Sequence, residues 1–221
     1  MARLPHRPGF RTASVPVAGP GEEELSADDL TALSELRPEA LERFYDIYFP
    51  RVYGYVARLV KDEHAAEDLT QDIFMNLHRA LSKYDPRRPL RPWVFTIAGN
   101  KVRDYWSSRA FQDRARGTSD EEETELLTAP LEPRAPERGP RETLAGAELS
   151  EAVALAIERL PAQLRETLVL RYYEELSFEE IARIVERNEV AVRKRYSRAL
   201  ALLREELAVL YGLGLAERGR G

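Results

Sequence analysis

The sequence predicts an all-α protein made of two helical modules joined by a linker, and three observations support this. Over most of its 221 residues, apolar side chains recur at the three- to four-residue spacing of an amphipathic helix. No segment alternates between apolar and polar residues for long enough to form a strand. A stretch rich in acidic residues and proline interrupts the helical pattern near the middle of the chain.

The first part of the chain predicts a tail followed by two or three helices. Residues 1–23 are rich in Pro, Gly and Arg and lack periodicity, so we expect a flexible tail. Ser26, followed closely by two aspartates, indicates a helix start. A second helix is expected to begin at Pro38, which a first turn tolerates, and to be interrupted at Pro50. Its expected inner residues are Leu41, Phe44, Tyr45 and Tyr48, and the pattern resumes with Val52, Tyr53, Val56, Leu59 and Val60.

Segment 66–81 predicts an amphipathic helix whose polar face is uneven. Its apolar face holds Ala66, Leu69, Ile73, Leu77 and Ala80. The opposite face carries Asp68, Gln71 and Asp72, with Met75 among them. A polar helix face is often simply solvated, but a flexible apolar side chain ringed by carboxylates favours a contact surface. Both interpretations follow from the pattern alone.

Segment 83–92 contains three prolines and predicts a stiff basic loop. Its cations are Lys83, Arg87, Arg88 and Arg91. A helix is expected from Trp93 to about Arg109, with Asn100 and Arg103 on the same polar arc as Trp93. An aromatic side chain beside Asn and Arg suits the stacking and hydrogen bonding of unstacked bases. The alternative is that Trp93 packs beneath the proline loop.

Segment 112–147 predicts a flexible linker, because it combines an acidic run with four prolines and has no apolar periodicity. Its acidity accounts for much of the formal net charge of −5, so the helical modules are less acidic than the whole chain. The predicted organisation is a tail, a first module, a linker, a second module and a C-terminal tail, at residues 1–23, 24–111, 112–147, 148–210 and 211–221.

The second module is expected to contain four helices. Ser150 is the predicted N-cap of the first, and Pro161 is expected to start the second. The second helix is expected to bury Leu164, Leu168 and Tyr172. Ser177 followed by Glu180 forms the capping-box pattern at the start of the third.

Segments 177–186 and 189–210 have the spacing of a helix-turn-helix. The outer arc of the second segment carries cations and small residues that permit close approach to a major groove: Ala191, Arg193, Lys194, Arg195, Ser197 and Arg198. An ordinary helical hairpin with a solvated basic face is the alternative. Glu186 stands where glycine usually relieves a positive φ, and Glu189 places a negative charge near the DNA end.

The sequence offers little for catalysis, metal binding or membrane insertion. His6, His64 and His78 lack metal-ligand spacing, and no glycine-rich phosphate loop or activated nucleophile is present. We therefore expect no enzyme, no cofactor and no metal site. The chain has no cysteine, which suits a reducing cytosol, and no run approaches the ~18 apolar residues of a membrane span. A soluble cytoplasmic protein is expected.

Two blocks of the sequence together resemble the bacterial RNA polymerase sigma factors of the extracytoplasmic-function (ECF) group, within the sigma-70 family. The first block, residues 41–109, contains AEDLTQDIF followed by the proline loop and a tryptophan-bearing helix, and resembles the family's region 2. The second block, residues 160–207, resembles region 4. The resemblance implies a subunit that binds core RNA polymerase and directs initiation at specific promoters.

The resemblance also implies roles for particular residues. Docking on the clamp coiled coil of core polymerase falls to Asp68, Leu69, Thr70, Gln71, Asp72 and Met75. Recognition and melting of the −10 promoter element falls to Lys83, Arg87, Arg88, Arg91, Trp93, Asn100 and Arg103. Recognition of the −35 element falls to Ala191, Arg193, Lys194, Arg195, Ser197 and Arg198. The implied partners are the clamp coiled coil and the flap of core RNA polymerase, promoter DNA and, as for many members, an anti-sigma factor.

Two other functions are compatible with the residues alone. A stand-alone helix-turn-helix regulator would bind operator DNA without polymerase, but it would leave the face around Met75 unexplained. A protein-only adaptor would bind partners without contacting DNA.

Overall fold

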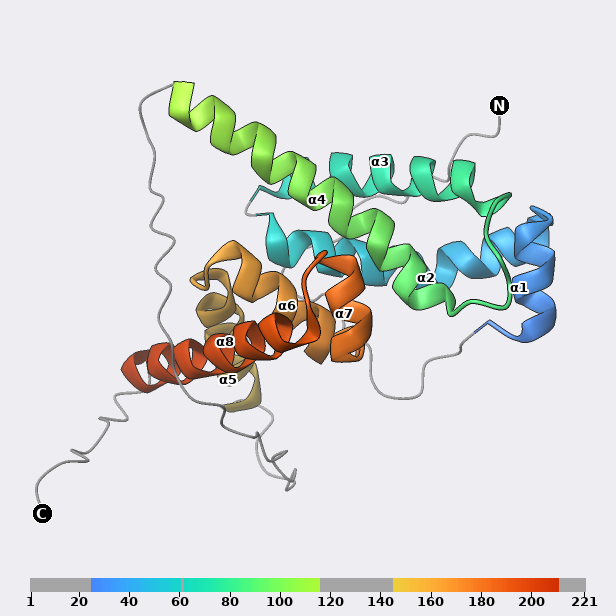
Figure 1. The fold of residues 1–221 in the computed structure, drawn as a ribbon. Helices are drawn as coiled ribbons and strands as arrows, with labels where there is room; N and C mark the ends of the chain where they lie inside the picture. Colours follow the sequence, from blue (N-terminus) through green and yellow to red (C-terminus); the bar gives the residue numbers. More distant parts are fainter. Residues whose placement is uncertain (1–24, 61, 116–144, 211–221) are drawn as a thin grey trace, which may run out of the picture. The chain divides into compact units, whose positions relative to one another are not determined.

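The computed structural model describes residues 25–60, 62–115 and 145–210 (Figure 1). These residues form eight α-helices and no strand, which confirms the predicted all-α class. The chain divides into two compact units, Met1–Val94 and Phe95–Gly221. The predicted tails, and most of the predicted linker, lie outside the described residues. The helices are α1 (Ala27–Ser34), α2 (Pro38–Leu59), α3 (Glu63–Leu81), α4 (Leu90–Ala115), α5 (Ala145–Glu158), α6 (Ala162–Tyr172), α7 (Phe178–Ile184) and α8 (Glu189–Leu210).

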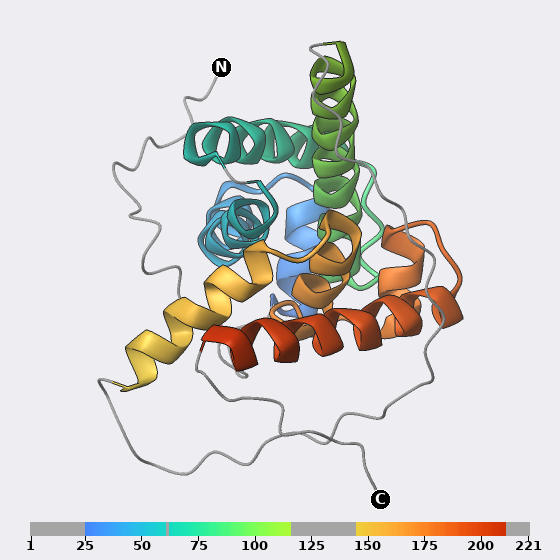
Figure 2. The same ribbon diagram turned by 90° about the vertical axis from the view of Figure 1, so that its left-hand side faces the viewer.

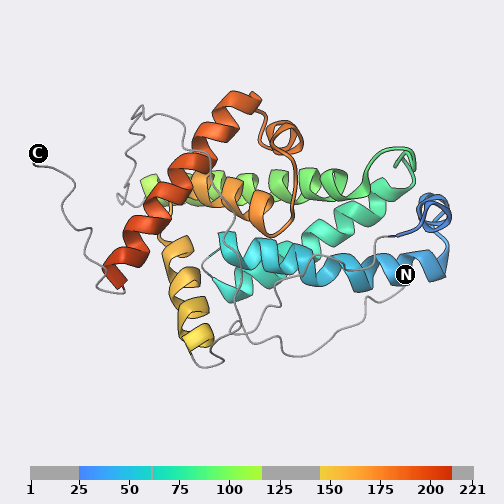
Figure 3. The ribbon, with the colours of Figure 1, turned by 90° about the horizontal axis from the view of Figure 1, so that it is seen from below.

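The first unit is built around the packing of α2 on α3, with α1 against the beginning of α2 (Figure 3). Ser26 caps α1 as predicted: the backbone N–H of Asp29 donates to Ser26 Oγ at 3.1 Å, and the backbone N–H of Ser26 donates to the Asp29 carboxylate at 3.2 Å. The core between the helices is rich in aromatic and aliphatic side chains that are fully or almost fully buried. These include Phe44, Val52, Tyr55, Val56, Ile73, Phe74 and Leu77.

The predicted interruption at Pro50 is wrong, because α2 continues unbroken through it. A proline in a helix removes one N–H and leaves the carbonyl four residues earlier without its donor. Pro50 and Asp46 are both exposed, so the Asp46 carbonyl lies on the solvent side, where water can satisfy it. The buried side chains on either side of Pro50, among them Tyr48 and Val52, keep both halves of the helix on one core.

Two helix starts lie earlier than predicted in the first half of the chain. Helix α3 begins at Glu63 because the Asp62 carboxylate caps it, accepting from the backbone N–H of Ala65 at 2.9 Å. Helix α4 begins at Leu90 rather than Trp93. Pro92 falls in its first turn, where a backbone N–H has no partner within the helix, so this proline does not prevent helix formation.

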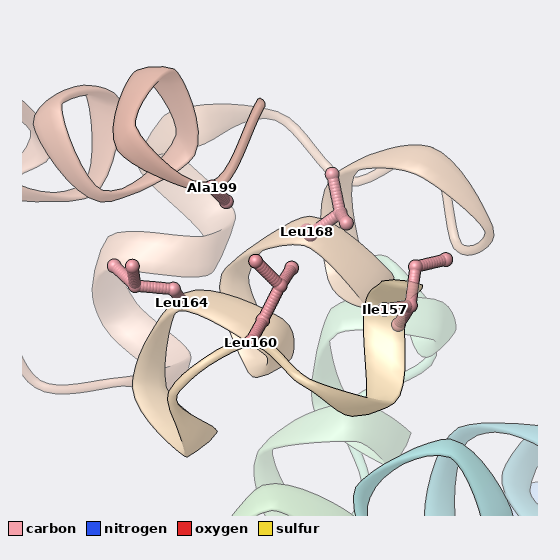
Figure 4. Packing of buried hydrophobic residues seen from close by; sticks show 5 residues of the cluster. All are labelled: Ile157, Leu160, Leu164, Leu168 and Ala199. Carbon is pink, nitrogen blue, oxygen red and sulfur yellow. The ribbon is translucent and has the colours of Figure 1, made fainter. Parts of the chain in front are cut away.

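The second unit includes the long helix α8, which packs against α5, α6 and α7. Helix α7 lies at the N-terminal end of α8 and α5 towards its C-terminal end (Figure 2). Apolar side chains from α5, α6, α8 and the turn between α5 and α6 form one buried cluster (Figure 4). The cluster consists of Ile157, Leu160, Leu164, Leu168 and Ala199.

Two predictions for the second module are wrong. Ser150 does not cap α5, which already begins at Ala145, because the preceding residues include the helix formers Ala, Glu and Leu. Tyr172 does not join the inner face of α6 and is 57% exposed. Eight residues of helix rotate Tyr172 by ~80° from Leu164, which takes it off the buried face.

Candidate functional site

The exposed face of α3 retains four of the six residues predicted to bind polymerase. Asp68, Gln71 and Asp72 are exposed, and Met75 is 41% exposed, which is unusual for a methionine. Leu69 and Thr70 point into the helix packing, and the Thr70 hydroxyl donates to the Ala66 carbonyl at 2.7 Å. The exposed part of this set, which we call the α3 face, therefore consists of Asp68, Gln71, Asp72 and Met75.

The charges of the α3 face are not neutralised locally. Within the part of the chain that the structure describes, neither Asp68 nor Asp72 takes part in an ion pair. The two carboxylates lie one helical turn apart, and Met75 lies one turn beyond Asp72. This arrangement presents a negative surface with an apolar side chain at one end, which suits a partner that offers cations beside an apolar patch.

The basic loop between α3 and α4 is organised by Asp85. Its carboxylate accepts from the backbone N–H of Arg87 at 3.1 Å, from Arg87 Nε at 2.9 Å and from Arg87 Nη2 at 3.1 Å. These bonds, led by the one from the Arg87 side chain, lower the pKa of Asp85 below its ordinary value. The hydroxyl of Tyr84 donates to the Arg88 carbonyl and so links the two ends of this part of the loop. Of the predicted cations, Lys83, Arg87 and Arg88 are exposed, and Arg91 is half-buried.

Trp93 packs on this loop, as one of its two interpretations predicted. Its ring centroid lies 5.0 Å from that of Tyr84, with the ring planes inclined by 49°. Tyr84 is buried and Trp93 is half-buried, so part of the indole surface remains accessible. The tyrosine fixes the orientation of the tryptophan, and the accessible part can still stack on a base.

Asn100 and Arg103 are neighbours on α4, and both side chains are engaged. Arg103 Nη2 donates to Asn100 Oδ1 at 2.6 Å and to the Ile184 carbonyl at 2.7 Å, and Arg103 Nη1 donates to Glu166 Oε1 at 2.8 Å. All of these groups belong to the second compact unit. Glu166 is only 2% exposed, so its carboxylate is a strong acceptor shielded from water. Arg103 thus has protein acceptors for both of its terminal nitrogens.

The turn between α7 and α8 has the conformation that a helix-turn-helix requires. The reciprocal bonds of Ser177 and Glu180 confirm the predicted capping box of α7. Glu186 has φ of 53°, the left-handed value expected of a glycine at this place. The backbone N–H of Arg187 donates to the Ala182 carbonyl at 3.0 Å, the long bond of a Schellman motif. The unusual glutamate therefore changes the energy of the turn without changing its geometry.

Helix α8 then starts with a cap that the sequence analysis did not identify. The Asn188 side chain accepts from the backbone N–H of Ala191 at 2.8 Å. Asn is among the preferred N-cap residues, so its place directly before the helix was an available signal.

The cations of α8 differ in the hydrogen bonds and ion pairs that their side chains make. Arg193 donates from Nε and Nη2 to Glu189 Oε1, at 3.0 and 2.5 Å, and its guanidinium lies 4.5 Å from the centroid of the Phe178 ring. The negative charge of Glu189 is therefore paired rather than free. Lys194 is exposed, whereas Arg195 donates to the Gln163 side chain. The other predicted residues, Ala191, Ser197 and Arg198, are half-buried.

Sequence reasoning missed one residue on this helix. Val190 is 64% exposed, the highest value among the exposed large apolar side chains of the described residues. It lies on the same face as Arg193 and Lys194, three and four positions later. The prediction for this helix rested on cations and small residues on its outer arc, and a valine is neither.

The described residues hold no metal-binding cluster and no membrane span. No group of three or more His, Cys, Asp or Glu side chains in residues 25–60, 62–115 and 145–210 could hold a metal ion. No helix in those ranges is both long and apolar enough to cross a membrane.

Comparison with known proteins matches both modules to one family. Residues 44–112 match the profile of sigma-70 region 2, and residues 150–203 match that of sigma-70 region 4. The chain is 34% identical over 166 residues to the ECF RNA polymerase sigma factor BldN of Streptomyces coelicolor, a match that covers 75% of this chain and 59% of BldN. It is 31% identical over 172 residues to the RNA polymerase sigma factor CarQ of Myxococcus xanthus, covering 78% of this chain and 91% of CarQ.

A solved structure shows the same fold. The sigma factor RpoE of Bartonella quintana, in complex with the anti-sigma factor NepR, superposes with a TM-score of 0.59. The alignment covers 77% of this chain and 98% of that one at 22% sequence identity.

Proposed function

The chain belongs to the ECF group of the sigma-70 family, the RNA polymerase sigma factors that direct promoter-specific transcription, and we propose how its surfaces divide that work. The carrying observation is that one chain combines an exposed acidic face on α3 with a correctly formed helix-turn-helix in α7 and α8. The first feature suits attachment to a protein, and the second suits reading of duplex DNA. We assign residues 24–111 to the region 2 module and residues 148–210 to the region 4 module.

The α3 face is the proposed attachment to the clamp coiled coil of core RNA polymerase. Its exposed carboxylates, Asp68 and Asp72, steer a cationic partner surface, and Met75 adds an adaptable apolar contact. Leu69 and Thr70 are buried, so their contribution is to hold the helix in place. The flap of core polymerase is the proposed second contact, through the region 4 module.

The basic loop and α4 are the proposed site for the −10 element. Lys83, Arg87, Arg88 and Arg91 supply positive charge for the phosphates, and the accessible part of Trp93 supplies a surface on which an unstacked base can lie. Asn100 and Arg103 complete the predicted set. Since the two side chains are bonded to each other, we expect them to engage the promoter as a unit, once acceptors on the nucleic acid replace those in the protein.

Helix α8 is the proposed reader of the −35 element. The N-terminal residues of a recognition helix contact base edges, and exposed cations behind them contact phosphates. Lys194 is exposed and can contact the phosphates, while Arg193 is pre-oriented by Glu189 and Phe178. Ala191, Arg195, Ser197 and Arg198 border this surface.

An anti-sigma factor is the proposed regulatory partner, because the related RpoE structure is that of a sigma factor bound to one. Since bacterial RNA polymerase works in the cytoplasm, we place the chain there. We propose no catalytic step for the chain itself.

Reconstituted transcription tests the proposal. The purified chain is added to core RNA polymerase with a pool of promoter fragments, and run-off transcripts are sequenced to locate the start sites. We expect transcripts that require both the chain and the core enzyme. Sequence-specific binding of duplex DNA without polymerase, and no transcripts with it, would instead indicate a stand-alone regulator. Binding to polymerase without any DNA footprint would indicate a protein-only adaptor.

A further inference from the structure

Val190 presents an apolar side chain where a recognition helix normally meets base edges. It is the second residue of α8, and 64% of its surface is exposed. Single exposed apolar residues are ordinary on protein surfaces, so exposure alone assigns no role. The position is what distinguishes this one, because the N-terminal residues of the second helix of a helix-turn-helix enter the major groove.

The side chains around Val190 make its surroundings compatible with DNA. Arg193 and Lys194 follow it on the same helix face, at a Cβ separation of ~6 Å. The carboxylate of Glu189, which would otherwise repel phosphate, is bound by Arg193 at 2.5 Å. The first turn of α8 thus offers an apolar side chain beside cations whose charge is complementary to the DNA backbone.

Only one group on the major-groove edges of the base pairs matches a valine. The edges of guanine, cytosine and adenine present hydrogen-bond donors and acceptors, whereas thymine adds its C5-methyl group. A valine can neither donate nor accept a hydrogen bond, so its favourable contact is burial of that methyl. Placing Val190 against a donor or acceptor would instead leave a polar group of the base without a partner.

We propose that Val190 reads a thymine in the −35 element by packing against its C5-methyl group. This rests on the proposed function, and it adds to the cations of α8 a residue that specifies one base. The phosphate contact of Lys194 sets affinity and position, while Val190 discriminates thymine from the other bases.

Replacing thymine with deoxyuridine tests the proposal, because that change removes only the methyl group. Holoenzyme is reconstituted from core polymerase and the full chain, and each thymine of the −35 element of a transcribed promoter is replaced in turn. We expect one position at which the replacement lowers promoter affinity about fourfold, equivalent to ~0.8 kcal/mol for one buried methyl. In Val190→Ala holoenzyme the same replacement should have no effect.

Two further variants control for folding and for general loss of apolar surface. Val190→Thr keeps the side-chain shape and one methyl, so it should retain part of the discrimination. Leu155→Ala truncates another exposed apolar side chain, 44% exposed on α5, and should leave the deoxyuridine effect intact. Val190 is largely exposed, so Val190→Ala removes little buried surface, and it places a better helix former in α8; helicity should therefore not fall.

The outcomes separate this proposal from the one on which it rests. Deoxyuridine effects that are equal in wild-type and Val190→Ala holoenzymes would overturn the role of Val190 while leaving the sigma-factor function intact. A −35 element without thymine would do the same. If the wild-type chain directs no transcription with core polymerase, the proposed function fails and the role of Val190 falls with it.

Discussion

Replacing Glu186 with glycine should stabilise the helix-turn-helix. Glu186 has φ of 53°, and for an L-residue the left-handed conformation costs roughly 1–2 kcal/mol. Glycine escapes that cost but loses about 0.5–1 kcal/mol in additional chain entropy on folding. The Glu186 side chain is exposed and makes no hydrogen bond or ion pair with the described residues, so nothing else is lost. The expected net gain for Glu186→Gly is therefore about 0.5–1 kcal/mol.

Hydrogen exchange of the backbone amides of α7 and α8 in the full chain measures this gain. Exchange that requires opening of these helices should slow about two- to fivefold in Glu186→Gly, the factor that corresponds to 0.5–1 kcal/mol. Glu186→Ala is the matched control, since it removes the carboxylate but keeps the Cβ atom, and it should give no comparable protection. Equal protection in both variants would show that the charge of Glu186, rather than its backbone conformation, sets the energy of this turn.

Three further predictions address polymerase docking, DNA binding and acid stability. Asp72→Arg should weaken core-polymerase binding fivefold or more, ~1 kcal/mol, without loss of helicity. Glu205→Arg, an equal charge change at an exposed site on α8, should not, and equal losses in a binding titration would contradict the docking role. Glu189→Gln should release Arg193 to the phosphates and steepen the salt dependence of holoenzyme–promoter binding by up to ~1 in the log–log slope, whereas an unchanged slope would contradict the pairing. The hydrogen bond from Ser26 is the main cause that lowers the pKa of Asp29 below 3.8. The ionised Asp29 carboxylate therefore stabilises the folded chain above pH ~4, and this stabilisation is lost as pH falls through the lowered pKa. Asp29→Asn should make acid unfolding, followed by circular dichroism, less steep below pH 4, and an identical acid transition would refute this.

Features that depend on neighbouring residues could be predicted from the sequence. The caps at Ser26 and Ser177 and the positive φ at Glu186 each follow from a few adjacent residues. The misplaced interruption at Pro50 has another origin, because Pro50 and Asp46 lie on the solvent side of α2, where water can satisfy the carbonyl that the proline leaves without a donor. Tertiary packing decides which side of α2 faces solvent, and the residues adjacent to Pro50 do not reveal that side.

The candidate site also combines features that the local sequence predicts with features that depend on distant residues. The exposure of Met75 followed from the helical wheel of α3. The burial of Thr70 could also be read there, since it adjoins the apolar stripe, but the resemblance to the family included it among contact residues. The bond between Arg103 and Glu166 joins residues 63 positions apart, and no periodicity or spacing rule connects them. Local rules therefore identified which segments form the surfaces, and the structure identified which side chains are already occupied.

The pairing of arginines with carboxylates bears on how a chain of net charge −5 can act on DNA. Arg87 is bound by Asp85 in the basic loop, and Arg193 is bound by Glu189 on α8. Each carboxylate cancels part of the attraction to phosphate, so counterion release contributes less to binding of any DNA sequence. The same carboxylates hold the guanidinium groups in fixed directions, which favours a correctly placed acceptor over a random one. Such reduced attraction to DNA is compatible with the proposed function, because the proposed attachment through the α3 face would raise the effective concentration of α8 at the promoter.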